Sequence, residues 1–287
     1  MNEIKGPLDL ISKKGVMSRY YIQPPIDIYS SEESHYYKEY KTYAEYNYLR
    51  PGLVAYIKTR HFELSLKLTR DYFHKCNVID FGCADGVFLP SLANYFTHVV
   101  AIDRVPDFVE LSAKLVSAMG LNNVELICND NLTINDTKSR LSGEKYHILY
   151  LLETLEHVGD KDSLYESKIN FLKEVSTLID ENGLIVISVP KMVGIPFLIQ
   201  RIGLAITRSR RELISLSDLF KACFLNDTTG LEKQWKGGHL GFNHRKLESY
   251  LKNEFHILKR KDIMFFQLLY VIRRKTKGKK RTLPNTV

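Results

Sequence analysis

The sequence predicts an α/β protein built on a doubly wound sheet that is mostly parallel and has an antiparallel edge strand. Between residues 77 and 190, short and nearly all-apolar segments alternate with longer amphipathic segments. Such apolar segments are typical of strands in a parallel sheet that helices cover on both faces. A glycine-bearing turn follows the first strand, and two apolar segments within residues 255–272 lie close enough to pair as antiparallel neighbours at one edge.

The elements are expected in a regular order along the chain. Strands are predicted at residues 78–81, 98–102, 124–128, 147–152 and 183–189, and the two edge strands at 255–259 and 263–272. Helices are predicted at residues 53–74, 87–96, 106–118, 167–179 and 244–251. In the helix over 167–179, Ile169, Leu172, Val175 and Ile179 share one face, as expected of a helix packed on a sheet.

The composition excludes several classes of protein. The chain has 287 residues, of which 44% are hydrophobic, so disordered and low-complexity classes are excluded. The four cysteines form no C-x-x-C pair, and neither a thiolate zinc site nor a disulfide scaffold is expected. No apolar stretch reaches the ~18–20 residues of a membrane span, and no signal peptide is visible. A cytoplasmic protein is therefore expected.

The positive charge is concentrated at one end of the chain. The formal net charge is +8, and residues 273–287 hold seven basic residues and no acid. The rest of the chain is close to neutral, whereas a nucleic-acid binder usually carries a basic face on its folded domain. The basic end fits either a solvated terminus or a contact with an anionic membrane surface or RNA.

Polar residues follow three successive predicted strands. Gly82 and Gly86 lie in the turn after the first strand, Asp103 ends the second, and Asp130 and Asn131 follow the third. Ligands bind at the carboxyl ends of the strands in such a sheet. A flexible turn, an acid that accepts ribose hydroxyls and a polar pair that reads a base together indicate a nucleoside site.

The spacing of the glycines argues against a dinucleotide. Gly82-x-x-x-Gly86 differs from the G-x-G-x-x-G of dinucleotide folds, and the charge of Asp85 would repel a pyrophosphate. A cationic or zwitterionic adenosine suits this acid-lined turn better. The alternative is structural: both glycines could serve a plain turn, and Asp103 could be a helix N-cap.

The motifs resemble those of the class I S-adenosylmethionine-dependent methyltransferases, which have a Rossmann-like fold. The resemblance lies in Val-Ile-Asp-Phe-Gly-Cys-Ala-Asp-Gly at 78–86, Ala-Ile-Asp at 101–103, and Leu-Leu-Glu-Thr-Leu-Glu-His-Val at 151–158. The last segment is similar to the E-x-x-E-H-V version found in ubiquinone-pathway O-methyltransferases. The resemblance covers residues 77–190 well and 238–273 loosely.

The resemblance implies a set of residues that bind S-adenosyl-L-methionine. They are Asp80, Gly82, Cys83, Ala84, Gly86, Asp103, Asp130, Asn131 and Leu152. By analogy, Asp80 and Gly82 hold the methionine end, Asp103 the ribose, and Asp130 with Asn131 the adenine, while the backbone of Leu152 lies near the sulfonium. Ala84 departs from the glycine that many members have.

Three interpretations of the segment after the fourth strand stay open. If the segment is helical, Glu153, Glu156 and His157 share one face, and His157 is a candidate base for a hydroxyl acceptor, with Glu153 beside it. The same three residues, with His239 as a fourth ligand, could hold a divalent cation such as Mg²⁺. Otherwise these side chains only cap and orient the loop.

The predicted organisation adds three segments to the cofactor-binding core. Residues 1–75 form an N-terminal helical cap with a tyrosine stripe at Tyr36, Tyr40 and Tyr43, and residues 76–190 form the core. Residues 191–238 form a helical insertion that serves as an acceptor lid, residues 239–273 complete the core, and residues 274–287 are a basic tail. The apolar part of the insertion, followed by Arg208, Arg210 and Arg211, fits either a lid or a helix lying on a membrane.

The expected activity is O-methylation of a small molecule, a glycan or a lipid-linked precursor. RNA 2′-O-methylation is an alternative, which the near-neutral body of the chain does not favour. A catalytically inactive binding module with the same fold is the third possibility. The sequence does not indicate an oligomeric state.

Overall fold

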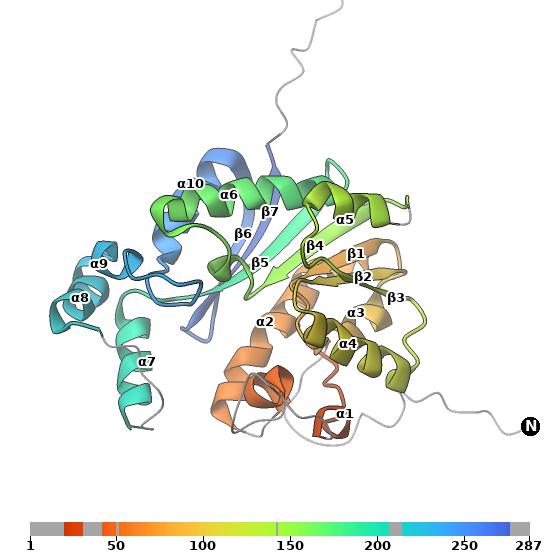
Figure 1. The fold of residues 1–287 in the computed structure, drawn as a ribbon, viewed down its shortest axis with the longest axis horizontal. Helices are drawn as coiled ribbons and strands as arrows, with labels where there is room; N and C mark the ends of the chain where they lie inside the picture. Colours follow the sequence, from red (N-terminus) through yellow and green to blue (C-terminus); the bar gives the residue numbers. More distant parts are fainter. Residues whose placement is uncertain (1–19, 31–41, 50–51, 142, 207–213, 276–287) are drawn as a thin grey trace, which may run out of the picture.

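The computed structural model describes residues 20–30, 42–49, 52–141, 143–206 and 214–275 (Figure 1). A seven-stranded sheet runs in the order β3-β2-β1-β4-β5-β7-β6. Its strands are β1 (Asn77–Phe81), β2 (Val99–Asp103), β3 (Val124–Cys128), β4 (Tyr146–Leu152), β5 (Leu184–Pro190), β6 (Phe255–Ile263) and β7 (Gln267–Arg274). Strands β1 to β5 are parallel, whereas β7 is antiparallel to both β5 and β6. The predicted fold class is confirmed.

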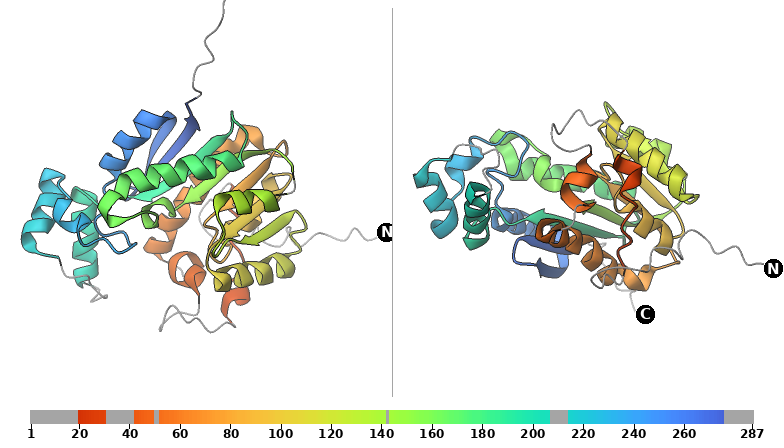
Figure 2. Two further views of the ribbon diagram at one scale, coloured as in Figure 1. Left: turned by 45° about the horizontal axis from the view of Figure 1, so that its top comes forward. Right: turned by 90° about the horizontal axis from the view of Figure 1, so that it is seen from below.

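Helices cover both faces of the sheet (Figure 2). One face carries α2 (Leu53–Thr69), α3 (Leu89–Tyr95) and α4 (Pro106–Met119), and the other carries α5 (Ile134–Arg140), α6 (Leu164–Val175) and α10 (His244–Glu254). Short helical turns connect these layers: η3 (Arg70–Tyr72), η4 (Leu155–His157), η5 (Lys161–Ser163) and η6 (Ser176–Leu178). The order of the strands reverses between β1 and β4, which is the place where ligands bind in doubly wound sheets.

Side chains alternate along each strand between two apolar clusters. Val78 and Ile148 belong to the cluster under α2, α3 and α4, and Ile79 and Leu149 to the cluster under α6 and α10. All four side chains are fully buried. Because both faces are covered, most positions in the central strands are apolar, and the strands are nearly continuous apolar runs in the sequence, with Asp80 and Ser188 as buried polar exceptions.

The apolar pattern does not predict α5. Its sequence, Ile-Asn-Asp-Thr-Lys-Ser-Arg, is almost entirely polar. The helix begins at a capping box in which Thr133 Oγ1 accepts the N–H of Asp136, and Asp136 Oδ2 accepts the N–H of Thr133. Local hydrogen bonding, rather than amphipathic periodicity, therefore starts this helix.

The edge hairpin turns later than the pattern suggests. Ile263, expected to begin the last strand, instead ends β6, and Met264 and Phe265 make the turn with φ angles of +46° and +71°. Apolar residues rarely adopt the left-handed conformation of such a turn. The apolar run over residues 263–272 therefore predicts one strand and does not reveal the turn at its start.

The N-terminal part contributes α1 (Asp27–Ser30) and the π-helical turn η2 (Glu45–Leu49) ahead of α2. Tyr43 packs its ring against Tyr48 and Phe108, which joins this part to α4. Tyr36 and Tyr40 of the predicted stripe lie outside the described residues.

The segment after β5 is helical, as predicted. It contains α7 (Ile195–Ile206), α8 (Leu216–Phe220), η7 (Lys221–Leu225) and α9 (Thr229–Glu232). A small cluster of its own, with Phe197, Ala222 and Leu231 buried, holds these turns together. Arg208, Arg210, Arg211 and the end of the basic tail, residues 276–287, lie outside the described residues. Within the described ranges, no helix is long and apolar enough to cross a membrane.

Two glycines with positive φ allow a matched test of the packing at the first turn. A Cβ on Gly86 (φ +80°) would lie 2.8 Å from Ser112 Oγ, whereas a Cβ on Gly120 (φ +60°) meets nothing within 4 Å. We expect Gly120→Ala to lower the free energy of unfolding by about 1–2 kcal/mol, the cost of a left-handed L residue. Gly86→Ala should cost about 1–3 kcal/mol more, because its Cβ overpacks the contact with α4.

Urea unfolding of the two variants and the wild type measures this difference. Equal losses of stability in both variants would show that the neighbours of Gly86 move aside at no cost, and that the turn is not tightly packed.

Candidate functional site

The turn after β1 is shaped by three residues with positive φ: Gly82 (+83°), Ala84 (+49°) and Gly86 (+80°). A Cβ on Gly82 would lie 2.4 Å from Thr154 Oγ1, so this turn packs directly on the segment that follows β4. Ala84 adopts a conformation that costs an L residue about 1–2 kcal/mol, and glycine would suit this position better. The backbone of the turn is therefore fixed by its neighbours rather than by its own preference.

Asp103 connects this turn to the end of β2. Its Oδ2 accepts the N–H of Ala84 at 2.9 Å, and its Oδ1 accepts the N–H of Val105 at 2.9 Å. Val105, not Asp103, is the N-cap of α4. Each carboxylate oxygen has two lone pairs, so Asp103 retains the capacity to accept further hydrogen bonds, as ribose hydroxyls would require.

Three poorly solvated carboxyl groups meet at this edge of the sheet. Burial and the charge of Asp103 raise the pKa of Asp80 to about 7. Burial raises the pKa of Asp85 to about 7 as well, although the hydrogen bond from Ala44 lowers it. Burial also raises the pKa of Asp103, against the hydrogen bonds from Val105 and Ala84. A bound cation would restore the ionised form of such acids.

Asp85 also anchors the N-terminal part of the chain. The Tyr29 hydroxyl donates to the Asp85 carbonyl at 3.0 Å, and the N–H of Ala44 donates to Asp85 Oδ2 at 2.5 Å. Asp85 Oδ1 is buried and has no hydrogen-bond partner within the described ranges. The N-terminal segments therefore contact the same turn that the sequence predicts to bind a ligand.

The other predicted cofactor residues lie at the same edge. Asp130 and Asn131 are exposed after β3, with Asn131 Nδ2 donating to Asp130 Oδ2 at 3.0 Å. Leu152 ends β4, and Cys83 is buried in the turn after β1. Because β1 to β4 are parallel, the structure brings all of these residues to the carboxyl ends of neighbouring strands.

The segment after β4 does not meet the condition for Glu153, Glu156 and His157 to share one helical face, because Glu153 is not helical. Glu153 has a φ of +53°, and its N–H contacts the carbonyl and hydroxyl of Ser188 on β5 at 3.1 and 3.0 Å. The 3₁₀ turn η4 begins only at Leu155. Hydrogen bonding to the neighbouring strand therefore overrides helix formation at Glu153.

Glu156, His157 and His239 nevertheless come together. Glu156 Oε1 lies 3.8 Å from His157 Nε2 and 3.6 Å from His239 Nδ1. Their potential ligand atoms all lie within 4.8 Å of one another, and Glu153 is not part of this group. His157 Nδ1 lies 2.6 Å from the carbonyl oxygen of Gly237. A carbonyl only accepts, so Nδ1 carries a proton, and in the neutral ring Nε2 is the nitrogen with the lone pair.

Glu156 is a buried carboxyl group without a hydrogen-bond partner. Its side chain is fully buried, and neither oxygen has a hydrogen-bond partner among the residues that the structure describes. Burial raises the pKa of Glu156 to about 8, while Lys168 and Lys58 lower it. An unpaired buried carboxylate beside two imidazoles could bind a divalent cation. The carboxylate could instead share a proton with one of the histidines.

Two lysines at this site carry no sequence signal. Lys58 on α2 donates to Asn47 Oδ1, and its charge lowers the pKa of Glu153 and Glu156. Burial and the charge of Glu156 raise the pKa of Glu153. Lys168 on α6 contacts the backbone of η4. Both helices are remote from residues 153–157 in sequence, so only the fold reveals these contacts.

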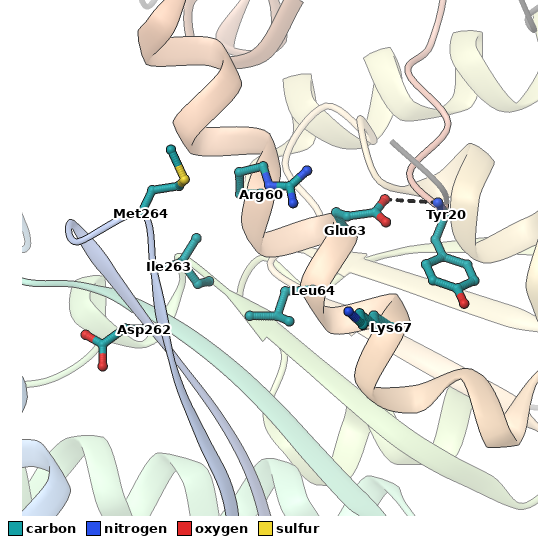
Figure 3. A pocket seen from close by; sticks show the side chains of 8 residues that line it. All are labelled: Tyr20, Arg60, Glu63, Leu64, Lys67, Asp262, Ile263 and Met264. Carbon is teal, nitrogen blue, oxygen red and sulfur yellow. Dashed lines mark hydrogen bonds between the residues drawn. The ribbon is translucent and has the colours of Figure 1, made fainter. Parts of the chain in front are cut away.

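A separate pocket of about 330 Å³ lies between α2 and the β6–β7 hairpin (Figure 3). Its acids are already engaged: Glu63 Oε2 accepts the N–H groups of Tyr20 and Tyr21 at 3.0 and 2.8 Å, and Asp262 pairs with Arg260 at 3.2 Å. None of the predicted site residues lines this pocket. It is therefore distinct from the candidate site.

Comparisons with known proteins agree with the geometry. The family model described as a methyltransferase domain matches residues 73–236, more than half of the chain. The match includes every predicted site residue except His239. Among solved structures, the PH0226 protein from Pyrococcus horikoshii OT3 shares the fold, with a TM-score of 0.54 and 16% identity over 83% of this chain and 100% of that one.

Two curated relatives match parts of the chain. Human EEF1A lysine methyltransferase 2 is 29% identical over 114 residues, which are 39% of this chain and 46% of the human protein. The ubiquinone biosynthesis O-methyltransferase of Glaesserella parasuis is 30% identical over 129 residues, 44% of this chain and 49% of that enzyme. The chain spans about half the length of these relatives. It belongs to the family of class I S-adenosylmethionine-dependent methyltransferase domains.

Proposed function

We propose that this protein transfers a methyl group from S-adenosylmethionine to an oxygen atom of a small molecule, a glycan or a lipid-linked precursor. The observation that carries the proposal is the cluster of Glu156, His157 and His239. Two of its residues follow Thr154, which packs on Gly82 in the turn after β1. A hydroxyl acceptor must lose a proton to react fully, and this cluster offers either a base or a cation site for that purpose.

The acids of the turn support binding of the cofactor. Asp80 and Gly82 would hold the methionine end, where the α-ammonium group compensates the poorly solvated carboxylates. Asp103 would accept the ribose hydroxyls, and Asp130 with Asn131 would contact the adenine. Cys83, Ala84, Gly86 and Leu152 would supply the backbone and walls of this site.

The reaction is an in-line displacement at the methyl carbon. The acceptor oxygen forms a bond to the methyl carbon, the carbon–sulfur bond breaks, and its electron pair stays on sulfur in S-adenosylhomocysteine. The proton of the acceptor passes to His157 Nε2. In the neutral ring Nε2 is unprotonated, because Nδ1 carries the proton and donates it to the Gly237 carbonyl. Glu153, whose pKa is raised, is the second candidate base. Positioning and exclusion of water supply the rest of the rate enhancement.

A divalent cation is the alternative use of the same cluster. Glu156, His157 and His239 would be its ligands. When bound, a cation such as Mg²⁺ would orient the acceptor oxygen and lower the pKa of its proton. The hydrogen bond from His157 to a backbone carbonyl is the support that metal-binding histidines usually have.

Several features bear on the class of acceptor. Ile195, Ile199 and Ile202 on α7 are 47%, 44% and 50% exposed, which favours an acceptor with a lipid part or contact with an anionic membrane. RNA remains the alternative acceptor, although the near-neutral charge outside residues 273–287 does not favour it. A location in the cytoplasm fits these proposals.

His157→Ala tests the base. We expect the rate of S-adenosylhomocysteine formation to fall about 10²–10⁴-fold, the usual contribution of a general base, while affinity for the cofactor stays unchanged. Turnover with catechol and glycan test acceptors and calorimetry with S-adenosylhomocysteine measure the two quantities. His256→Ala, at an exposed histidine on β6, is the control. Unchanged turnover in His157→Ala would rule out the base.

Mn²⁺ alone tests the cation site. We expect the wild type to bind Mn²⁺ and Glu156→Gln to bind it at least about tenfold more weakly, because the variant loses an anionic ligand. Electron paramagnetic resonance titration measures free Mn²⁺. Glu254→Gln, at an exposed acid paired with Lys173, is the control and should match the wild type. Equal binding by Glu156→Gln, or turnover that a chelator leaves intact, would contradict the cation.

The raised pKa values of the acids predict how cofactor affinity depends on pH. Asp80 and Asp85 are largely protonated below their pKa of about 7 and ionise as the pH rises through it. Affinity for zwitterionic S-adenosylhomocysteine should therefore increase by about tenfold from pH 5.5 to pH 7.5, since binding the ammonium group releases a proton.

Neutral 5′-methylthioadenosine, which lacks the amino-acid part, is the control ligand and should bind with little dependence on pH. Asp80→Asn should remove much of the increase for S-adenosylhomocysteine. Parallel pH profiles for the two ligands, measured by calorimetry, would show that these acids do not face the amino-acid part.

A further inference from the structure

Lys168 on α6 is a fully buried lysine that the proposed chemistry does not use. Its Nζ donates to the carbonyl oxygens of Leu155 at 3.0 Å and Glu156 at 2.8 Å, and also to that of Val158. A lysine is almost never fully buried unless its charge is compensated. Here all three N–H groups of the ammonium donate to one short segment, residues 155–158, which contains η4.

The other side of the ammonium group faces a second segment, residues 235–242. Nζ lies 4.8 Å from the ring centre of Trp235 and 5.6 Å from that of Phe242. The Trp235 indole N–H donates to the carbonyl of Gly238 at 2.8 Å, next to His239. Aromatic faces attract a desolvated cation, so Lys168 holds this segment as well as the first one.

The two segments carry the two histidines of the cluster. His157 belongs to the first segment, His239 belongs to the second, and the bond from His157 Nδ1 to the Gly237 carbonyl joins them directly. The rings are 4.8 Å apart. Without a donor at Lys168, the carbonyls of Glu156 and Val158 would lose this partner, and the carbonyl of Leu155 would keep the N–H of Val158 at 3.3 Å. The turn would have to rotate to find other donors.

We propose that Lys168 is a positioning residue that fixes the geometry of His157 and His239 by binding both of their segments at once. That the cluster is the reacting centre rests on the proposed function, whereas the positioning of the two histidines by Lys168 does not. Lys168 touches neither histidine side chain in the contacts described above, and it acts through the backbone of one segment and the Trp235 ring of the other.

Lys168→Met tests the proposal, because methionine keeps an unbranched apolar stem and removes the ammonium group. The matched control is Leu172→Ala, one helical turn further along α6, which is fully buried and destabilises the fold by another route. Imidazole ¹H–¹⁵N spectra, with His157 assigned from His157→Gln, report the tautomer of that ring. Mn²⁺ titration and calorimetry with S-adenosylhomocysteine provide the other two readouts.

We expect the Nδ1–H tautomer of His157 in the wild type and in Leu172→Ala, and a mixture of tautomers in Lys168→Met. Mn²⁺ should bind Lys168→Met about 10- to 100-fold more weakly, as for other groups that support metal ligands. Affinity for S-adenosylhomocysteine should change less than twofold. A Lys168→Met protein that loses stability as Leu172→Ala does, yet keeps the Nδ1–H tautomer, overturns the proposal.

Trp235→Phe serves if Lys168→Met does not fold, because it removes the indole donor to Gly238 and reduces the aromatic face that Lys168 contacts. It should weaken Mn²⁺ binding and broaden the signals of His239, and unchanged spectra would count against the proposal. If the wild type binds no Mn²⁺ and transfers no methyl group, the proposed function is contradicted, and not the role of Lys168. The tautomer comparison still decides the role of Lys168 in that case.

Discussion

The Asp103 carboxylate, shared between two backbone N–H groups, is the interaction on which the site depends. One oxygen holds Ala84 in its left-handed conformation, and the other holds Val105 at the start of α4. The fixed turn then packs on Thr154 and, through Asp85, on the N-terminal segments. A single buried acid thereby links the ends of β1 and β2, the segment after β4 and the residues that precede α2.

This arrangement places several carboxyl groups close together at buried positions that are little exposed to water. Asp80, Asp85 and Glu156 all have raised pKa values because they are buried, and the charges of Lys168 and Lys58 offset part of the rise in the pKa of Glu156. Such a site is more favourable with a cation in it than without one. The electrostatics of the protein thus agree with a ligand that carries an ammonium and a sulfonium group, independently of any family likeness.

The sheet and the turn after β1 were predictable because their causes are local. Continuous apolar runs identify strands buried on both faces, and glycines at 82 and 86 identify a turn that needs positive φ. α5 was missed because a capping box, not an apolar stripe, starts it. The sequence left open whether Glu153 lies in a helix, and the structure answers it, because Ser188 on the neighbouring strand accepts the N–H of Glu153. Lys58 and Lys168 were invisible, since tertiary packing alone places them in the site.

The position of β7 has a consequence for synthesis of the chain. β7 lies between β5 and β6 in the sheet, although it is the last strand of the seven to be made. Until it emerges, the ribosome-bound chain presents one side of β5 as an unpaired edge of Leu-Ile-Val-Ile-Ser-Val-Pro, a segment that the finished fold buries completely. Such an edge readily pairs with other chains. Chaperone demand should therefore be highest after β5 has left the ribosome and before β7 has, and should fall once the hairpin docks.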